Sequence, residues 1–188
     1  MVVSWQSVLD EISQCEKCEL CRTRTHTVPG EGNYHARVMF VGEGPGADED
    51  RMGRPFVGRA GQLLDKMIAA MGLTREEVYI ANVVKCRPPQ NRTPLPEETF
   101  ACLPYLRAQF ALIRPQIIVC LGATAAKALI NPELCITRDR GVWVEKKGVW
   151  MMPTYHPAAL LRDVSKKREA WEDLQLVMAK LKELENEQ

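Results

Sequence analysis

A chain of 188 residues is long enough to bury one substantial core and matches the size of a single domain, so we expect one domain over residues 1–188. A hydrophobic share of 46% without any apolar run of membrane-spanning length is typical of a soluble α/β protein and argues against an integral membrane protein. The net charge of +1 gives no general attraction to nucleic acid, which would require local basic patches.

The N-terminal stretch and the cysteines indicate a compartment. Glu11 and Gln14 interrupt the first residues before the apolar core of a signal peptide could form, so we expect a cytoplasmic protein. In that reducing environment the seven cysteines are expected to bind metal or to be reactive rather than to form disulfides. We also expect a monomer with no membrane partner.

The first predicted element is a short amphipathic helix over residues 4–12, which leads into a C-x-x-C pair formed by Cys15 and Cys18. A turn of this spacing points both thiolates toward one metal centre. Cys21 is either a substitute ligand or a bystander. Residues 22–33 lack periodicity and read as a loop.

Four consecutive apolar residues at 38–41 predict a strand buried on both faces. The loop at 42–46 follows its carboxyl end, where open α/β sheets bind ligands, and contains Glu43 and Gly44. Pro45 stands where phosphate-binding N–H groups would be needed, which argues against a P-loop or a dinucleotide site. Beyond an acid-rich turn, Phe56 either stacks on a planar ring or simply packs.

A helix at 58–71 precedes a second buried strand at 78–84. Asn82 is polar inside this strand, so its amide is either satisfied by backbone neighbours or held rigidly to read the hydrogen-bonding edge of a ligand; we favour the second interpretation. The proline-rich loop that follows carries three cations and no acid, a composition suited to phosphate contacts: Lys85, Arg87 and Arg92.

The remaining elements complete a doubly covered sheet. We expect a helix at 96–112, a strand at 116–121, a helix at 124–130, a hairpin at 143–150 with a fourth strand at 149–152, and a final amphipathic helix at 168–184. The segment 153–162, which contains His156, reads as a loop at the same sheet edge as residues 42–46. Cys120 and Cys135 lie in apolar company and are expected to be buried packing residues.

Two candidate centres follow from this order. Cys15, Cys18, Cys86 and Cys102 form a possible all-thiolate tetrad, which suits tetrahedral zinc or an iron-sulfur cluster equally well. His156 is either a core histidine bonded to a carbonyl or a catalytic group. Its expected convergence with Glu43 and Asn82 favours catalysis. The set combines an amide that can recognise a ligand, a hydrogen-bond donor for developing negative charge and an acid that could orient water.

Four motifs in this order resemble the family-4 uracil-DNA glycosylases, which are iron-sulfur enzymes of the uracil-DNA glycosylase superfamily. They are GEGPG at 42–46, GRPFVGRAGQLL at 53–64, NVVKCRPPQNRTP at 82–94 and HPAALLR at 156–162, with C-x-x-C upstream. The resemblance implies an α/β/α sandwich around a four-stranded parallel sheet. It also implies a structural 4Fe-4S cluster on Cys15, Cys18, Cys86 and Cys102.

The activity implied is excision of uracil from DNA, which leaves an abasic site. The nucleotide would be flipped out of the duplex, with Leu160, Leu161 and Arg162 wedged into the vacated space. Phe56 would stack on the base, and Asn82 would donate to O4 and accept from N3–H.

In the same interpretation, His156 and the backbone N–H of Gly44 would hydrogen-bond the charge growing on O2. Glu43 and Glu49 are alternative candidates to orient water or to stabilise the sugar cation, and Asn91 is a further candidate at the substrate. The expected phosphate contacts are Lys85, Arg87, Arg92, Arg162, Lys166, Lys167 and Arg168.

Two other functions fit part of the pattern. One is a relative that grips or crosslinks uracil-containing DNA without turnover. The covalently trapping relatives that this chain resembles carry a histidine-bearing basic insertion in the loop after the Asn82 strand, but this loop has no histidine. A redox protein would explain the cysteines but would leave Asn82 and His156 without a role. Turnover is therefore favoured.

Overall fold

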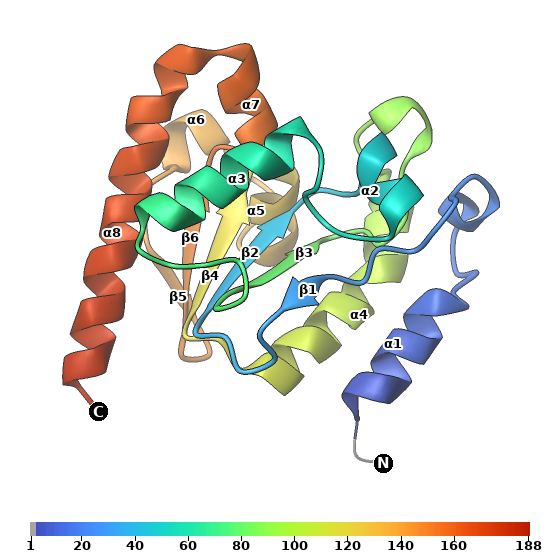
Figure 1. The fold of residues 1–188 in the computed structure, drawn as a ribbon, viewed down its shortest axis with the longest axis horizontal. Helices are drawn as coiled ribbons and strands as arrows, with labels where there is room; N and C mark the ends of the chain where they lie inside the picture. The colour runs from blue at the N-terminus through green and yellow to red at the C-terminus, as the bar shows by residue number, and fades with distance from the viewer. Residues whose placement is uncertain (1–2) are drawn as a thin grey trace.

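The fold is a three-layer sandwich, seen here in a computed structural model that describes residues 3–188 (Figure 1). One six-stranded sheet forms the middle layer, in the order β1-β3-β2-β4-β6-β5. Its four inner strands run parallel, and the two short edge strands run antiparallel. The strands are β1 (Glu31–Gly32), β2 (Val38–Gly42), β3 (Tyr79–Asn82), β4 (Ile117–Leu121), β5 (Val144–Lys146) and β6 (Val149–Thr154).

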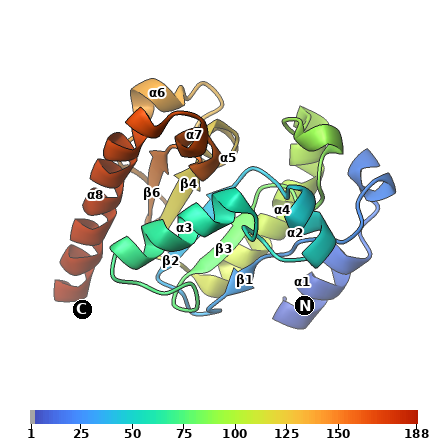
Figure 2. The same ribbon diagram turned by 45° about the horizontal axis from the view of Figure 1, so that its top comes forward.

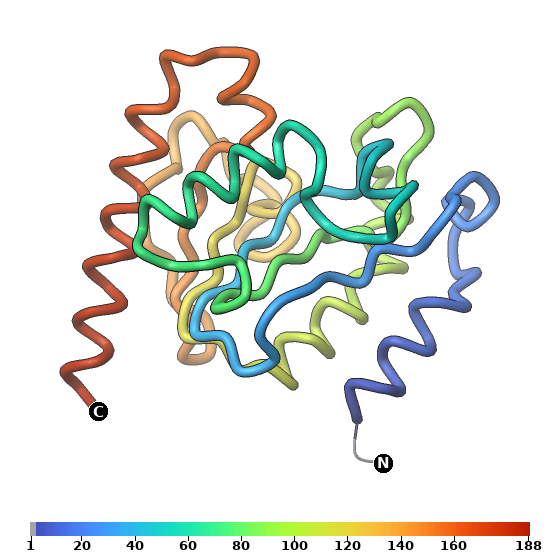
Figure 3. Tube along the Cα trace, in the orientation of Figure 1, coloured from blue at the N-terminus to red at the C-terminus, as the bar shows by residue number. Residues whose placement is uncertain are grey.

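Helices cover both faces of this sheet. The helices are α1 (Trp5–Ser13), α2 (Ala47–Met52), α3 (Arg59–Ala70), α4 (Pro96–Ile113), α5 (Ala123–Leu129), α6 (Ile136–Asp139), α7 (Pro157–Arg162) and α8 (Lys167–Asn186), with 3-10 turns at Glu19–Arg22, Pro89–Asn91 and Val164–Lys166. Helices α1, α4 and α5 pack on one face, whereas α3, α7 and α8 pack on the other (Figure 2). The chain trace places α1 and α8 at opposite ends of the molecule (Figure 3).

The core follows from the alternation of side chains along the inner strands. In β2, Met39 and Val41 point into the cluster beneath α1 and α4, whereas Val38 and Phe40 point into the cluster beneath α3 and α8. All of β2 is therefore buried, which is why it is an uninterrupted apolar run. The expected α/β/α sandwich around four parallel strands is confirmed, with two antiparallel edge strands in addition.

Some elements differ from the expectation. The acid-rich turn after residue 46 is in fact α2, whose first turn carries three acids that complement its dipole. The expected loop after β6 contains α7, which begins at Pro157 with His156 as its N-cap. The expected strand at 78–84 is shorter, since β3 ends at Asn82. Cys120 is buried as expected, but the expectation for Cys135 is wrong, because its side chain is exposed on the surface.

Two glycines allow the segments at the carboxyl edge to approach closely. A Cβ at Gly42 would lie 2.5 Å from the Phe56 ring and 2.7 Å from Asn82 Oδ1. A Cβ at Gly122, whose φ is +92°, would lie 2.9 Å from the Cβ of His156. Within residues 3–188, no helix has both the length and the apolar character needed to cross a membrane.

Candidate active site and cysteine centre

A cleft of about 700 Å³ opens at the carboxyl ends of the four parallel strands. The register sets its geometry, because Gly42 of β2 is paired with Asn82 of β3, and Leu121 of β4 with Thr154 of β6. The segments that leave these four strands therefore meet at one edge. The cleft is lined by Glu43, Gly44, Glu49, Phe56, Asn82, Asn91, Arg92, Thr124, His156 and Arg162, so the expected convergence of the acidic glycine loop, the amide and the imidazole is present in the structure.

Phe56 and His156 form the apolar wall of the cleft. Their rings are stacked, with centroids 5.5 Å apart and planes 28° from parallel. The backbone of Phe56 has a φ of +50°, which is costly for a phenylalanine. Its carbonyl accepts a hydrogen bond of 3.0 Å from the guanidinium of Arg75. The surrounding contacts thus hold the Phe56 ring in one place against the cleft.

The side chain of Asn82 is buried with an unmet hydrogen-bonding requirement. It is 1% exposed, and its Oδ1 is the one buried side-chain nitrogen or oxygen of residues 3–188 without a hydrogen-bond partner. An unsatisfied buried acceptor costs roughly 1–3 kcal/mol. The protein pays that cost in its unliganded form, so this oxygen is set up to accept a hydrogen bond from a ligand.

His156 has a fixed tautomer and is uncharged. Its Nδ1 accepts a hydrogen bond of 3.0 Å from the backbone N–H of Ala158, so the ring proton must reside on Nε2. Burial, with a smaller contribution from the charge of Arg162, lowers the pKa of His156 to about 4. At neutral pH the imidazole is therefore a neutral hydrogen-bond donor through Nε2.

The two candidate acids differ in how their oxygens are used. Glu49 accepts three backbone hydrogen bonds, from Gly46, Val57 and Gly58 at 3.1, 2.8 and 2.6 Å, and so ties α2 to the turn after Phe56. Glu43 accepts one side-chain hydrogen bond of 2.5 Å, from Thr124 at the start of α5. Glu49 thus organises the loop, whereas Glu43 keeps an oxygen available.

Four of the expected DNA contacts lie at or near the cleft rim. Arg162 lies exposed at the rim, and Leu161 beside it is 36% exposed. Arg87 is half-buried and donates through Nε to Asn91 at 2.8 Å. The guanidinium of Arg92 makes two hydrogen bonds with Glu98, at 2.9 and 2.7 Å, so its charge is already paired.

Two of the expected DNA contacts are wrong. Lys85 is 1% exposed, and its Nζ donates to the Asn82 carbonyl at 2.9 Å and to Gln109 Oε1 at 2.8 Å, so it cannot reach a phosphate. Burial lowers the pKa of the Lys85 ammonium to about 8, an effect that a charge on the Cys102 thiol opposes. Leu160 is 2% exposed and packs beneath α7 in the core, so it cannot act as a wedge in this position.

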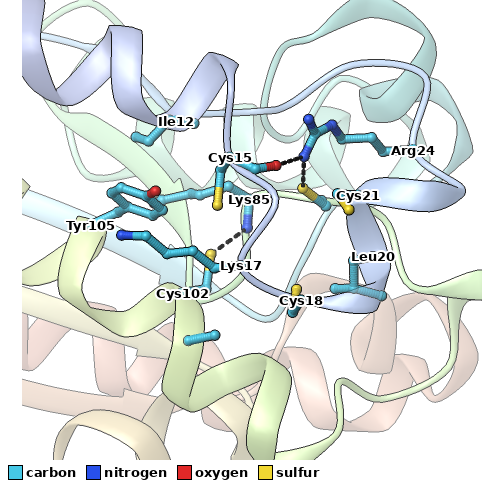
Figure 4. A pocket seen from close by; sticks show the side chains of 12 residues that line it. Ile12, Cys15, Lys17, Cys18, Leu20, Cys21, Arg24, Lys85, Cys102 and Tyr105 are labelled. Atoms are coloured by element: carbon cyan, nitrogen blue, oxygen red, sulfur yellow. Dashed lines mark hydrogen bonds between the residues drawn. The ribbon is translucent and has the colours of Figure 1, made fainter.

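The cysteine centre is a separate cavity that five thiols line (Figure 4). The thiols are those of Cys15, Cys18, Cys21, Cys86 and Cys102. Burial raises the pKa of Cys18 and Cys86, and raises that of Cys102 to about 11, so metal binding would have to displace protons from these thiols. In the part of the chain that is described, no three His, Cys, Asp or Glu side chains converge tightly enough to hold a single ion.

The chemistry of this donor set fits an all-thiolate centre. Two N–H groups already point at the sulfurs: the backbone N–H of Lys85 donates to Cys102 Sγ at 3.2 Å, and Arg24 Nη1 donates to Cys86 Sγ at 3.4 Å. Hydrogen bonds of this kind stabilise thiolate charge and hold the ligands in place. The expected grouping of Cys15 and Cys18 with Cys86 and Cys102 is therefore compatible with the structure.

Comparison with known proteins decides the family. The sequence profile of the uracil DNA glycosylase superfamily matches residues 29–175. The type-4 uracil-DNA glycosylase of Thermotoga maritima is 51% identical over 162 residues, covering 84% of this chain and 83% of that protein. The chain belongs to the type-4 uracil-DNA glycosylases. The type-4 enzyme of Archaeoglobus fulgidus is 49% identical over 166 residues, with the same two coverages, and a type-5 uracil-DNA glycosylase of Pyrobaculum aerophilum is 36% identical over 150 residues, covering 71% and 66%.

The family resemblance found in the sequence is thus confirmed. The sequence analysis did not single out two residues of this type-4 glycosylase. Thr124, which donates a hydrogen bond to Glu43, is the second residue of α5 and lies three positions after the end of β4, so its place at the ligand-binding edge was a usable signal. Arg24, which contacts the cysteine centre, lies in a stretch without periodicity, and no local pattern indicates its role.

Proposed function

We propose that this protein is a DNA repair glycosylase that hydrolyses the bond between uracil and deoxyribose in DNA. The observation that carries the proposal is the unpartnered Oδ1 of Asn82, a residue that lines the same cleft as the stacked Phe56 and His156 rings. Uracil supplies what this site lacks: a planar ring to lie against Phe56 and an N–H to satisfy the buried oxygen.

Base selection follows from the amide. With Oδ1 accepting from N3–H, the Asn82 amino group donates to O4 of uracil. Cytosine presents an unprotonated N3 and an amino group at these positions, so both interactions would become repulsive. A site built around a buried polar group rejects a mismatched partner strongly, because the mismatch leaves that group unpaired.

The reaction breaks the C1′–N1 bond, and the bonding electrons leave with uracil. Negative charge then grows on O2, where Nε2–H of the neutral His156 and the N–H of Gly44 donate hydrogen bonds. The sugar becomes cationic at C1′ and is attacked by a water molecule, whose proton must be accepted. We assign that role to Glu43, held by Thr124, and the loop-building role to Glu49.

DNA would approach across the rim of the cleft. Arg162 and Arg87 are the cations best placed for phosphate, with Lys166, Lys167 and Arg168 following α7, and binding should weaken with salt. Leu161, which is partly exposed beside the rim, replaces Leu160 as the apolar group available to fill the space of a flipped nucleotide. Asn91, bonded to Arg87, stays a candidate contact to the substrate.

We infer that Cys15, Cys18, Cys86 and Cys102 hold a 4Fe-4S cluster. The support is the shared cavity, the N–H groups aimed at the sulfurs and the resemblance to iron-sulfur glycosylases. The bound cluster would supply a structural crosslink between the N-terminal segment and the loop after β3. Iron and sulfide analysis of the purified protein tests this inference, and a colourless, zinc-loaded active protein would contradict it.

The decisive experiment is excision from oligonucleotides carrying U:G, U:A, single-stranded U, T:G or hypoxanthine. We expect abasic sites from uracil and none from T:G. A heat- and detergent-stable protein–DNA adduct instead of abasic sites would indicate the non-turnover alternative. Unchanged excision by both Asn82→Ala and His156→Ala variants would refute the proposed site.

A further inference from the structure

Lys85 presents an unexplained buried charge. Its side chain is 1% exposed, and Nζ contacts two neutral oxygens, the Asn82 carbonyl at 2.9 Å and Gln109 Oε1 at 2.8 Å. None of the ion pairs formed within residues 3–188 involves Lys85, so no carboxylate lies within 4.0 Å of its ammonium. A lysine is almost never fully buried unless its charge is paired, because desolvation penalises an isolated ion severely.

The cysteine cavity beside Lys85 can supply the missing negative charge. The residue lines the cysteine cavity, and its backbone N–H donates to Cys102 Sγ at 3.2 Å (Figure 4). Gln109, which accepts a hydrogen bond from the ammonium, is itself neutral and donates to the carbonyl of Pro29. Thiolates bound to metal carry the net negative charge that nothing else near Lys85 supplies.

A second cation, Arg24 from the N-terminal segment, lines the same cavity. Arg24 Nη1 contacts Cys86 Sγ at 3.4 Å and the carbonyl of Cys15 at 2.6 Å, and Arg24 is likewise absent from the carboxylate pairs of the described residues. Two cations without carboxylate partners therefore line the same cavity as the thiols. Their positive charge is balanced only when several of these thiols are ionised.

We propose that Lys85 is the buried counter-charge of the cysteine centre, assisted by Arg24. The inference rests on the metal-binding part of the proposed function and not on uracil excision. The buried position makes the effect of Lys85 strong, because charges are screened least where water is absent. The positive charge of Lys85 should change two properties of the cysteine centre. It favours retention of the anionic thiolate ligands, and it stabilises the reduced, more negative form of the cluster.

The test compares three variants of the metal-loaded protein. Lys85→Met removes the charge and keeps a side chain of similar length. Gln109→Met removes a hydrogen bond of the ammonium but keeps its charge. Lys17→Met removes an exposed lysine that lines the same cavity, where water screens its charge. The measurements are the rate at which a chelator removes iron and the midpoint reduction potential of the cluster.

For Lys85→Met we expect the chelator to remove iron about tenfold faster, which is the size of effect seen when a group that supports metal ligands is lost. We also expect the midpoint reduction potential to become more negative. Gln109→Met and Lys17→Met should keep the potential of the unmodified protein. A Lys85→Met protein that fails to load metal, beside a Gln109→Met protein that loads it, would also support the counter-charge. The inference is overturned if Lys85→Met keeps both properties, or if Gln109→Met reproduces its defect.

These readouts separate this inference from the proposed function. Potential and iron loss are measured without DNA, so a protein that does not excise uracil could still show the predicted difference between variants. If the purified protein contains zinc, the cluster assignment fails, and the order of chelator-driven zinc loss among the same three variants then decides the role of Lys85.

Discussion

The Asn82→Ala variant should lose uracil excision while keeping its stability. In most proteins a buried asparagine stabilises the fold through its hydrogen bonds, and its removal lowers the melting temperature. Here the Oδ1 atom of Asn82 has no partner, so the folded protein gains nothing from it in the absence of a ligand. The two effects of the substitution should therefore separate.

The magnitudes follow from the contacts. Removal of the unsatisfied oxygen relieves roughly 1–3 kcal/mol, and the small void left behind costs a similar amount. The free energy of unfolding should therefore change by less than about 1 kcal/mol, which is about 3 °C in melting temperature for a chain of this size. Two lost hydrogen bonds to uracil, at about 1.5 kcal/mol each, should lower kcat/KM roughly a hundredfold.

Gln109 provides the matched comparison, because it is a buried amide whose hydrogen bonds are satisfied. It is fully buried and bonds to Lys85, to the Pro29 carbonyl and to the Tyr79 hydroxyl. Gln109→Ala should therefore lower the melting temperature well beyond Asn82→Ala. Thermal unfolding of the metal-loaded variants and excision from a uracil-containing duplex give both numbers. An Asn82→Ala protein that is strongly destabilised yet excises uracil normally would refute the reasoning.

Because His156 is neutral, its titration should leave kcat/KM unchanged between about pH 8 and about pH 5 and should lower it only near pH 4. A kcat/KM that declines as the pH rises from about 5 to about 7 would contradict a neutral donor. The free energy of unfolding should fall as the pH drops from 6.5 to about 4, because in this range His156 binds a proton in the unfolded chain but not in the folded protein. In steady-state assays Thr124→Val should lower kcat about tenfold with little change in KM, and Thr124→Ser should restore most of it. Thermal unfolding of Glu49→Gln should occur about 4 °C lower, because three backbone N–H groups share that carboxylate. Cys86→Ser should bleach the visible absorbance of the proposed cluster, and substitution of the exposed Cys135 by Ser should not.

The sequence predicts the sheet and its edge well because their signals are local and strong. Apolar runs identify the strands, and the rule that ligands bind at the carboxyl ends of parallel strands brings residues 43, 82 and 156 together before any coordinates are known. The short helices α2 and α7 escape this reasoning, since six residues give too little periodicity to distinguish a helix from a turn.

Side-chain roles are predicted less well, because they depend on directions that the sequence does not contain. Lys85 lies in a loop with two other cations, which favours a phosphate contact, yet its side chain turns inward to Gln109, 24 positions along the chain. Leu160 and Leu161 are adjacent apolar residues, and only the helical phase of α7 decides that the first is buried and the second partly exposed. Glu43 and Glu49 are equivalent acids until their hydrogen bonds are seen.

The two centres share one short segment of chain. Asn82, which faces the cleft, is four residues from Cys86, which faces the cysteine cavity, and Lys85 between them binds the Asn82 carbonyl with its side chain and Cys102 Sγ with its backbone. A shift of the proposed cysteine ligands must therefore move the main chain that positions the Asn82 amide, the group proposed to read uracil, because packed segments transmit strain rather than absorb it. Loss of the metal should consequently impair base selection before it impairs DNA contacts at the rim, which depend on α7.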